Sequence, residues 1–241
     1  MDSNYKLYDY TASFKRIDSI IAQPQGSYEE TKALPDRDKL TFENGFYSYC
    51  SALFVDIRDS STLPSAYNRP RLAKIYRAFI SEMVALLNSN SHTREVNIVG
   101  DCVWAVYNTT STSDIDDVFA IAYQANSLIK VLNYKFQKAG YPTPISVGIG
   151  MSYGRALMIK AGYSGSGIND VVYMGDVVNQ AAKLASMGSK GGEAPIVMDG
   201  VFHQNLKEDN QKLLTRKGYS DVFTGNVVGN AMEAWYTANC T

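Results

Sequence analysis

The chain has 241 residues, 45% of them hydrophobic and 20% charged, which is enough to bury the core of one large domain or of one domain with an extension. Its formal net charge of −1 excludes the strongly basic surface that a protein coating nucleic acid needs. Only two histidines and three cysteines are present, none with metal-type spacing, so zinc or histidine-based acid–base chemistry is disfavoured.

The N-terminus lacks the apolar run and small-residue cleavage site of a signal peptide. No stretch approaches the roughly 18 apolar residues that cross a bilayer. The odd number of cysteines is typical of reduced thiols. We therefore expect a cytoplasmic protein without a membrane span.

Residues 1–44 are polar and are interrupted by two prolines and a glycine. Apolar side chains at helical spacing predict one short amphipathic helix there, and they are Phe14, Ile17, Ile20 and Ile21. We expect an N-terminal extension, residues 1–44, packed on a main domain that covers 45–241.

The main domain begins with a predicted strand over 46–57, whose continuously apolar end is typical of a buried central strand. Apolar residues at helical spacing over 72–86 predict a helix. Residues 96–107 predict a β-hairpin with a Gly-Asp turn. A second amphipathic helix is predicted over 118–132, before a glycine and a proline that stop it.

Two further strands are predicted, over 145–154 and 156–163, followed by a glycine-rich loop and a strand over 171–174. A helix from Asp176 to about Met187 comes next. The order β-α-β-β-α-β, followed by further elements, predicts an α+β fold on the ferredoxin-like plan.

Two aspartates stand at the ends of strands that should be neighbours in the sheet. Asp56 ends the first buried strand and Asp101 lies at the hairpin turn. Either carboxylate alone would be interpreted as a turn cap. Two carboxylates at matching strand ends, beside the backbone amides of 57–61, suit a pair of divalent cations that hold a triphosphate.

A third motif is "MGDVVNQAAKLA", which predicts a helix with Asp176 as its N-cap. Asn179 and Lys183 are four residues apart, so they share one face of that helix. Asparagine has a poor propensity for helix interiors, which suggests a functional reason for its presence. A solvated polar face is the alternative.

In this order the motifs resemble the class III nucleotidyl cyclases. The resemblance rests on "FVDI", on "GD" with its aspartate 45 residues after Asp56, on "VGIGMSYG" and on "GDVVNQAAKL". It covers residues 46–187 and extends to Tyr236. It implies that 45–241 is a class III nucleotidyl cyclase catalytic domain, with a βαββαβ core and extra C-terminal strands.

The resemblance also implies roles for individual residues. Asp56, Asp101 and Ile57 would ligate two Mn²⁺ or Mg²⁺ ions. Asn179 would orient the ribose, and Lys183, where the family usually has arginine, would stabilise the reacting phosphate. The family's head-to-tail arrangement implies a homodimer, with the metal ligands of one subunit facing the Asn/Lys helix of the other.

The triphosphate is bound in this family by a lysine from the C-terminal hairpin, where this chain has Val228. Ile57 and Arg58 are predicted to contact the substrate near the metals, and Arg58 could replace the missing lysine. Other basic residues that could replace the missing lysine are Lys190, Arg216 and Lys217.

Two positions that read the base depart from both purine patterns. Adenylate cyclases have lysine at the position of Asn97 and aspartate at that of Val172, and guanylate cyclases typically have glutamate and cysteine. The present pair resembles the bacterial pyrimidine cyclases of Pycsar anti-phage systems, whose cyclic UMP or cyclic CMP activates a separate effector. The resemblance favours UTP as substrate and leaves CTP open, with adenylate or guanylate cyclase activity less favoured.

Two other interpretations remain at this level. A ferredoxin-like sheet that carries Tyr49, Trp104 and Tyr107 could stack RNA bases, although the slight acidity of the chain disfavours this. A degenerate cyclase could serve as a nucleotide-binding partner, because Lys183 and Val228 depart from the family pattern. The retention of both aspartates and Asn179 favours an active enzyme.

Overall fold

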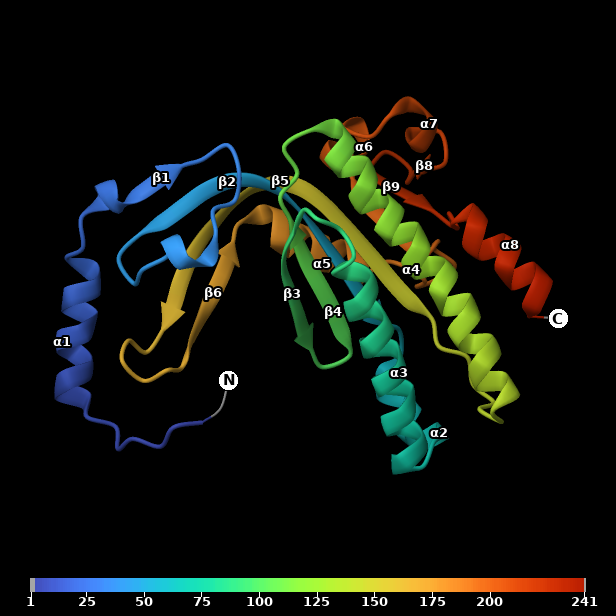
Figure 1. The fold of residues 1–241 in the computed structure, drawn as a ribbon, viewed down its shortest axis with the longest axis horizontal. Helices are drawn as coiled ribbons and strands as arrows, with labels where there is room; N and C mark the ends of the chain where they lie inside the picture. Colours follow the sequence, from blue (N-terminus) through green and yellow to red (C-terminus); the bar gives the residue numbers. More distant parts are fainter. Residues whose placement is uncertain (1–2, 241) are drawn as a thin grey trace.

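In the computed structural model, which describes residues 3–240, a nine-stranded mixed sheet organises the chain (Figure 1). Its central path has the order β3-β4-β2-β5-β7-β9-β8, while β1 pairs with β2 and β6 pairs with β5. The strands are β1 (Tyr28–Glu30), β2 (Gly45–Ile57), β3 (Thr93–Val99), β4 (Cys102–Tyr107), β5 (Val147–Gly162), β6 (Asn169–Met174), β7 (Ile196–Asp199), β8 (Thr215–Arg216) and β9 (Val222–Gly225).

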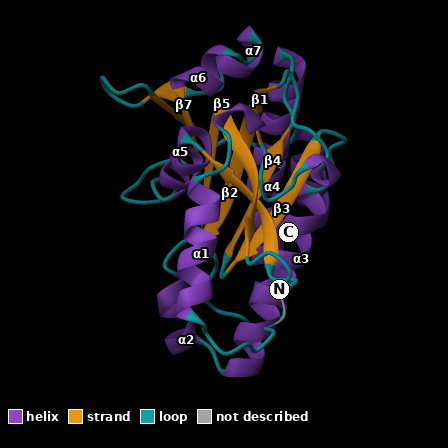
Figure 2. Ribbon diagram, turned by 90° about the vertical axis from the view of Figure 1, so that its left-hand side faces the viewer, coloured by secondary structure: helices purple, strands orange, loops and turns teal. Residues whose placement is uncertain are grey.

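Helices cover both faces of this sheet (Figures 1 and 2). Short 3-10 turns, η1 (Gln25–Ser27), η2 (Arg37–Lys39) and η3 (Ser60–Thr62), lie in the loops. The helices are α1 (Tyr10–Ile21), α2 (Leu63–Ala66), α3 (Arg69–Leu87), α4 (Thr112–Lys138), α5 (Asp176–Ala185), α6 (Gly200–Gln204), α7 (Glu208–Gln211) and α8 (Asn230–Asn239). No helix within residues 3–240 is long and apolar enough to cross a membrane.

The predicted ferredoxin-like plan is confirmed by the order β2-α3-β3-β4-α4-β5 and by the antiparallel arrangement β3-β4-β2-β5. Two apolar clusters fill the two faces. The first joins alternate residues of β2, such as Leu53 and Val55, to α3 and α4. The second joins the intervening residues, such as Ala52 and Phe54, to α5. Because side chains alternate along a strand, β2 is buried on both faces and reads as a continuous apolar run.

One predicted strand break is wrong. Residues 145–154 and 156–163 were predicted as two strands, but β5 runs unbroken from Val147 to Gly162 and pairs with the whole of β2. Gly154, where the break was predicted, has ordinary extended backbone and lies opposite Cys50. A Cβ at this position would lie 3.5 Å from the Val177 Cβ of α5, an ordinary contact, so neither backbone conformation nor space requires a glycine here.

Helix starts also differ from the prediction. Helix α4 begins at Thr112, six residues before the apolar pattern, because Ser111 and Asp114 form a capping box. Helix α5 begins at Asp176 as predicted, but the N-cap is Gly175 and not Asp176. Gly175 has φ of 141°, a conformation that only glycine adopts readily.

The N-terminal region adds to the sheet. Strand β1 extends it by pairing in parallel with β2, and Leu34 and Leu40 are buried in the α5-side cluster. Helix α1 stands at the end of the sheet with no buried residue, which leaves its apolar residues Phe14, Ile20 and Ile21 exposed (Figure 1).

Candidate active site

The two predicted metal ligands lie together. Asp56, at the end of β2, pairs in register with Cys102 of β4, and Asp101 immediately precedes Cys102 in the hairpin turn. Burial raises the pKa of Asp56, and the charge of Asp101 raises it further, while Arg58 opposes the rise. Two carboxylates this close repel each other unless a cation lies between or beside them.

The cation beside Asp56 in this structure is its own neighbour, Arg58. The Arg58 guanidinium pairs with the Asp56 carboxylate, and Arg58 Nη1 donates to the carbonyl oxygen of Ser186 at 3.1 Å. Arg58 therefore joins the end of β2 to the segment just after α5. It also shows that this carboxylate takes a positive partner.

The donor set fits a magnesium-type or manganese-type site. Among residues 3–240 no group of three His, Cys, Asp or Glu side chains is placed to hold a metal. Two carboxylates, a backbone carbonyl such as that of Ile57 and substrate phosphates are the usual ligands of Mg²⁺ at phosphoryl-transfer sites. A site of this kind is completed by its nucleotide.

Two neighbours of the aspartates were not predicted as site residues. Burial raises the pKa of the Cys102 thiol to about 12, and both aspartates add to the shift, so Cys102 stays protonated. The Tyr76 hydroxyl on α3 is close enough to Asp101 for that charge to raise its pKa, after the larger effect of burial. Tyr76 belongs to the apolar stripe of α3, so no sequence signal separates it from core residues.

The predicted anion-binding loop is smaller than expected. The prediction used the backbone amides of residues 57–61, but the Arg58 amide already donates to the Ser146 carbonyl at 2.8 Å. Asp59 adopts a left-handed conformation with φ of 50°, which turns the backbone into η3. The amides of residues 59–61, in the turn that leads into η3, remain candidates to face an anion.

Helix α5 packs on the sheet through small residues. A Cβ at Gly150 would lie 2.1 Å from the Ala181 carbonyl oxygen, and one at Gly148 would lie 1.9 Å from that of Ala185. These two glycines of "VGIGMSYG" therefore allow the helix to approach β5 closely. The buried residues of α5 are Val177, Ala181, Leu184 and Ala185.

Asn179 and Lys183 lie on the opposite side of α5 and are exposed. Neither side chain has a hydrogen bond or ion pair with any residue of the described chain. Asn179 is also six residues, about 9 Å of helix rise, from Ala185, which packs on Gly148, the β5 residue opposite Asp56. One subunit therefore brings Asp56 and Asp101 together but turns Asn179 and Lys183 away from them.

The base-reading positions differ in their surroundings. Asn97 on β3 is half-buried, lies opposite Trp104 and has no hydrogen-bond partner within residues 3–240. Val172 on β6 is 38% exposed and lies opposite Ile159. Its neighbour Tyr173, and not Val172, packs into the α5-side cluster. Glu95, two residues before Asn97, and Asp170, two residues before Val172, both pair with the Arg37 guanidinium.

The basic residues predicted as substitutes for the missing lysine have different partners. Lys217 pairs with Glu193, and Arg216 Nε donates to the Ser220 carbonyl at 2.9 Å. Lys190, in the loop after α5, is exposed and has no ion pair in the described part of the chain. Arg58 is the member of the set beside the aspartates.

The aromatic platform for RNA is contradicted. Tyr107 is fully buried and its hydroxyl donates to the Leu87 carbonyl at 3.0 Å. Trp104 stacks in parallel on Phe54, with ring centroids 5.0 Å apart. Of the three predicted platform residues only Tyr49 is exposed, so these three do not form a row of free rings.

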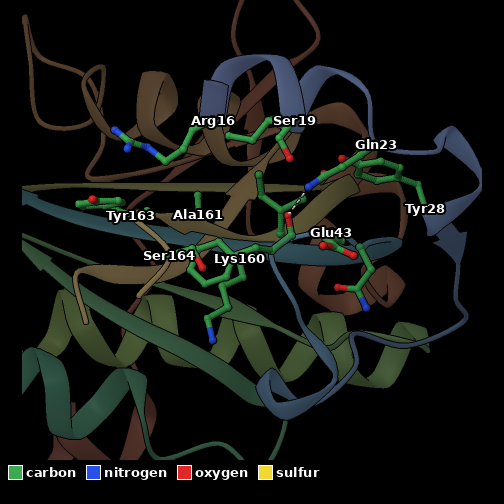
Figure 3. Close-up of a pocket in the computed structure, with 14 residues that line it drawn as sticks. Arg16, Ser19, Gln23, Tyr28, Glu43, Lys160, Ala161, Tyr163 and Ser164 are labelled. Atoms are coloured by element: carbon green, nitrogen blue, oxygen red, sulfur yellow. Dashed lines mark hydrogen bonds between the residues drawn. The ribbon is translucent and has the colours of Figure 1, made fainter. Parts of the chain in front are cut away.

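A cavity of about 550 Å³ lies elsewhere, between α1 and the end of β5 (Figure 3). Arg16, Ser19 and Gln23 line it from α1 and the residues after it, while Lys160 and Tyr163 line the other side. Gln23 Nε2 donates to the Phe42 carbonyl across it at 3.4 Å. None of the predicted site residues lines this cavity.

Comparisons with known proteins agree with this fold. The adenylate and guanylate cyclase catalytic domain matches residues 43–236. A uridylate cyclase of Gulbenkiania mobilis is 46% identical over 99% of this chain and 100% of its own length. A uridylate cyclase of Treponema porcinum is 38% identical over 89% of this chain and 74% of its own length.

Solved structures show the same fold at lower identity. The adenylyl cyclase CyaB of P. aeruginosa is 18% identical, with a TM-score of 0.63 over 75% of this chain and 95% of that one. A class III adenylyl cyclase-like ATP-binding protein from Pseudomonas aeruginosa is also 18% identical, with a TM-score of 0.70 over 93% of this chain and 48% of that one.

Proposed function

This chain belongs to the adenylate and guanylate cyclase catalytic domain family, and from that premise we propose that it converts UTP to 3′,5′-cyclic UMP and pyrophosphate. The observation that carries the substrate is the 46% identity, over nearly the full length of both chains, to a protein named uridylate cyclase. The paired aspartates and the exposed Asn/Lys face of α5 support this reaction.

In this reaction the ribose 3′-oxygen attacks the α-phosphorus in line, and the bond to pyrophosphate breaks as the 3′-hydroxyl proton is lost. Two Mn²⁺ or Mg²⁺ ions held by Asp56, Asp101 and the Ile57 carbonyl would lower the pKa of the 3′-hydroxyl and neutralise the triphosphate. The chain's own residues then supply positioning and charge, and no histidine is needed.

Each proposed site uses two subunits. Asn179 would hold the ribose and Lys183 the reacting phosphate, but both face away from the aspartates of their own chain. A head-to-tail homodimer places the partner subunit's Asn179 and the partner subunit's Lys183 against Asp56 and Asp101. Arg58, now paired with Asp56, would contact the triphosphate once cations replace it there.

Asn97 reads the base in this proposal. Its amide offers one acceptor and two donors, so it accepts from N3–H of uracil while it donates to O4. With the amide flipped, the same side chain donates to N3 of cytosine and accepts from its amino group. A purine would leave buried polar groups unpaired at about 1–3 kcal/mol each. Val172 adds no polar group to this contact.

We further propose that the product is a second messenger in bacterial defence against phage. Cyclic UMP formed in the cytoplasm would bind a separate cyclic-nucleotide-sensing effector. Support for this comes from the resemblance of the base-reading pair, Asn97 and Val172, to that of the pyrimidine cyclases.

The test is an assay of the purified chain with Mn²⁺ and each of the four nucleoside triphosphates. Pyrophosphate release and the mass of the cyclic product are both measured, with Asp101→Ala as the matched blank. Cyclic UMP as the main product supports the proposal. Cyclic CMP as the main product would reassign the base, and cyclic AMP or cyclic GMP with UTP unused would overturn it.

A further inference from the structure

An arginine of the N-terminal region joins two strands that are not neighbours in the sheet. Arg37, in η2, donates from Nη1 to both carboxylate oxygens of Glu95 on β3, at 2.6 and 2.7 Å. Its Nη2 donates to Asp170 at the start of β6. Within residues 3–240, β3 pairs only with β4 and β6 pairs only with β5.

The segment that carries Arg37 is fixed on both sides. Leu34 and Leu40 are buried in the α5-side cluster, and the Leu34 amide donates to Asn108 Oδ1 at 2.9 Å. Anchors three residues to either side hold Arg37 at one place above the sheet. The guanidinium is thus presented to Glu95 and Asp170 by packed backbone and does not depend on a free chain end.

Glu95 and Asn97 belong to the same face of β3. Their partners on β4, Val106 and Trp104, both pack in the α5-side cluster. A register shift just before Glu95 leaves Arg94 as the extra residue of a bulge, a feature that re-aims neighbouring side chains. The direction of Asn97 therefore depends on how this short edge strand is held at Glu95.

Glu95 is held almost entirely by Arg37. The Glu95 side chain is 10% exposed, so its charge needs a partner. The hydroxyl of Tyr173 on β6 is buried without a hydrogen-bond partner in the described structure, and the Glu95 charge is close enough to raise its pKa, after the larger effect of burial. If Arg37 were removed, Glu95 would be drawn to this free donor and away from its present position.

We propose that Arg37 is a positioning residue for base selection, which sets the position of Asn97 on β3 relative to β6 through its contacts with Glu95 and Asp170. This inference rests on the proposed function, because it takes Asn97 as the base reader. Arg37 touches neither the metals nor the phosphates in this scheme, so it acts on the choice of nucleotide and leaves the chemical step alone.

The chain offers a matched control on the same two elements. Arg94 Nη1 pairs with Asp36 at 3.1 Å, one residue before Glu95 on β3 and one residue before Arg37. The Asp36 side chain is 75% exposed, against 10% for Glu95, and ion pairs with so exposed a carboxylate contribute little to stability. Arg94→Gln therefore removes a similar charge from the same strand without touching Glu95.

The experiment measures the dissociation constants of non-hydrolysable UTP, CTP, ATP and GTP analogues with Mn²⁺, for Arg37→Gln, Arg37→Lys and Arg94→Gln. We expect Arg37→Gln to lower the preference for the best base over the others by about tenfold, the loss of one charged hydrogen-bond contact. Arg37→Lys should recover part of the lost base preference. Arg94→Gln should stay within about twofold of the unmodified chain.

A purely structural role for Arg37 predicts something different. Loss of stability would lower the melting temperature or weaken all four analogues equally, and an unchanged ratio in Arg37→Gln would overturn the proposal. Glu95→Gln combined with Arg37→Gln should have no larger effect on the ratio than Arg37→Gln alone, since both act on one contact. If the unmodified chain prefers a base other than uracil, the proposed substrate is wrong, while the change in ratio still decides the role of Arg37.

Discussion

The two faces of the sheet are built for different tasks. The face under α3 and α4 is closed by large apolar side chains, such as Phe79 and Phe119, which are fully buried. The face under α5 carries Asp56 at one end and Asn97 at an edge, and its helix turns Asn179 and Lys183 outward. One face is therefore wholly apolar packing, while the other adds to its apolar cluster the polar groups that the proposed function assigns to the nucleotide, the metals and a second subunit.

The sharpest test of this division removes a carboxylate from the α5-side face. Asp56→Ala and Asp101→Ala should each reduce cyclic nucleotide formation by at least about 10²- to 10³-fold, the scale of losing a main source of charge stabilisation. Thermal unfolding should change little, because neither side chain belongs to an apolar cluster. Near-normal turnover of either variant with saturating Mn²⁺ would show that the metal assignment is wrong.

A change on the face under α3 and α4 should lower the stability of the fold more than a change on the outer side of α5. Phe79→Ala removes a fully buried ring between α3 and the sheet and should lower the free energy of unfolding by about 3–5 kcal/mol. Denaturant unfolding measures this, with Lys183→Ala on α5 as the control, whose exposed side chain should matter by no more than about 0.5 kcal/mol. Equal losses in the two variants would contradict a division between the faces.

Mixing two inactive variants tests whether the α5 face is completed by a second subunit. Asp56→Ala and Asn179→Ala should both be inactive alone. After subunit exchange about a quarter of the sites should be intact, because half of the dimers are mixed and each mixed dimer keeps one complete site. No recovery, in a mixture shown by tagged subunits to exchange, would mean that each chain uses its own Asn179.

The smallest expected effect is on the pH dependence of stability. The pKa of Asp56 is raised by burial and by Asp101, so without metal the folded protein resists its ionisation. Protonated Asp56 therefore stabilises the folded protein at low pH. This contribution to the free energy of unfolding is lost as the pH rises from the ordinary aspartate pKa, about 3.9, through the raised pKa. Mn²⁺ needs the ionised carboxylate, so its stabilising effect should grow over the same range.

Melting curves across this range, with and without Mn²⁺, measure the effect. Asp56→Asn is the control, because it keeps the shape of the side chain and cannot ionise. The change of melting temperature with pH should be smaller in Asp56→Asn, and Mn²⁺ should raise the melting temperature of this variant by less. An identical change of melting temperature with pH in the variant would mean that other groups cause the pH dependence.

Much of the fold followed from local pattern. The apolar run of β2, the Gly-Asp hairpin turn and the helical spacing of α3 and α4 each express a backbone preference or a buried face that depends on nearby residues. The order of motifs then indicated the cyclase family, which the match over residues 43–236 confirms. The break after Gly154 was wrongly predicted, because a glycine inside a long strand looks, in the sequence, like one that ends a strand.

By itself, the sequence determined the order β2-α3-β3-β4-α4, the two carboxylates at matching strand ends and the shared face of Asn179 and Lys183. Only the tertiary structure decided that Arg58 neutralises Asp56, that Tyr76 stands beside Asp101 and that Arg37 joins Glu95 to Asp170. The Arg37 contacts join residues 58 and 133 positions apart. Periodicity reports which face of an element is buried, but the partners of a charged side chain depend on how distant elements pack, so no local pattern records them.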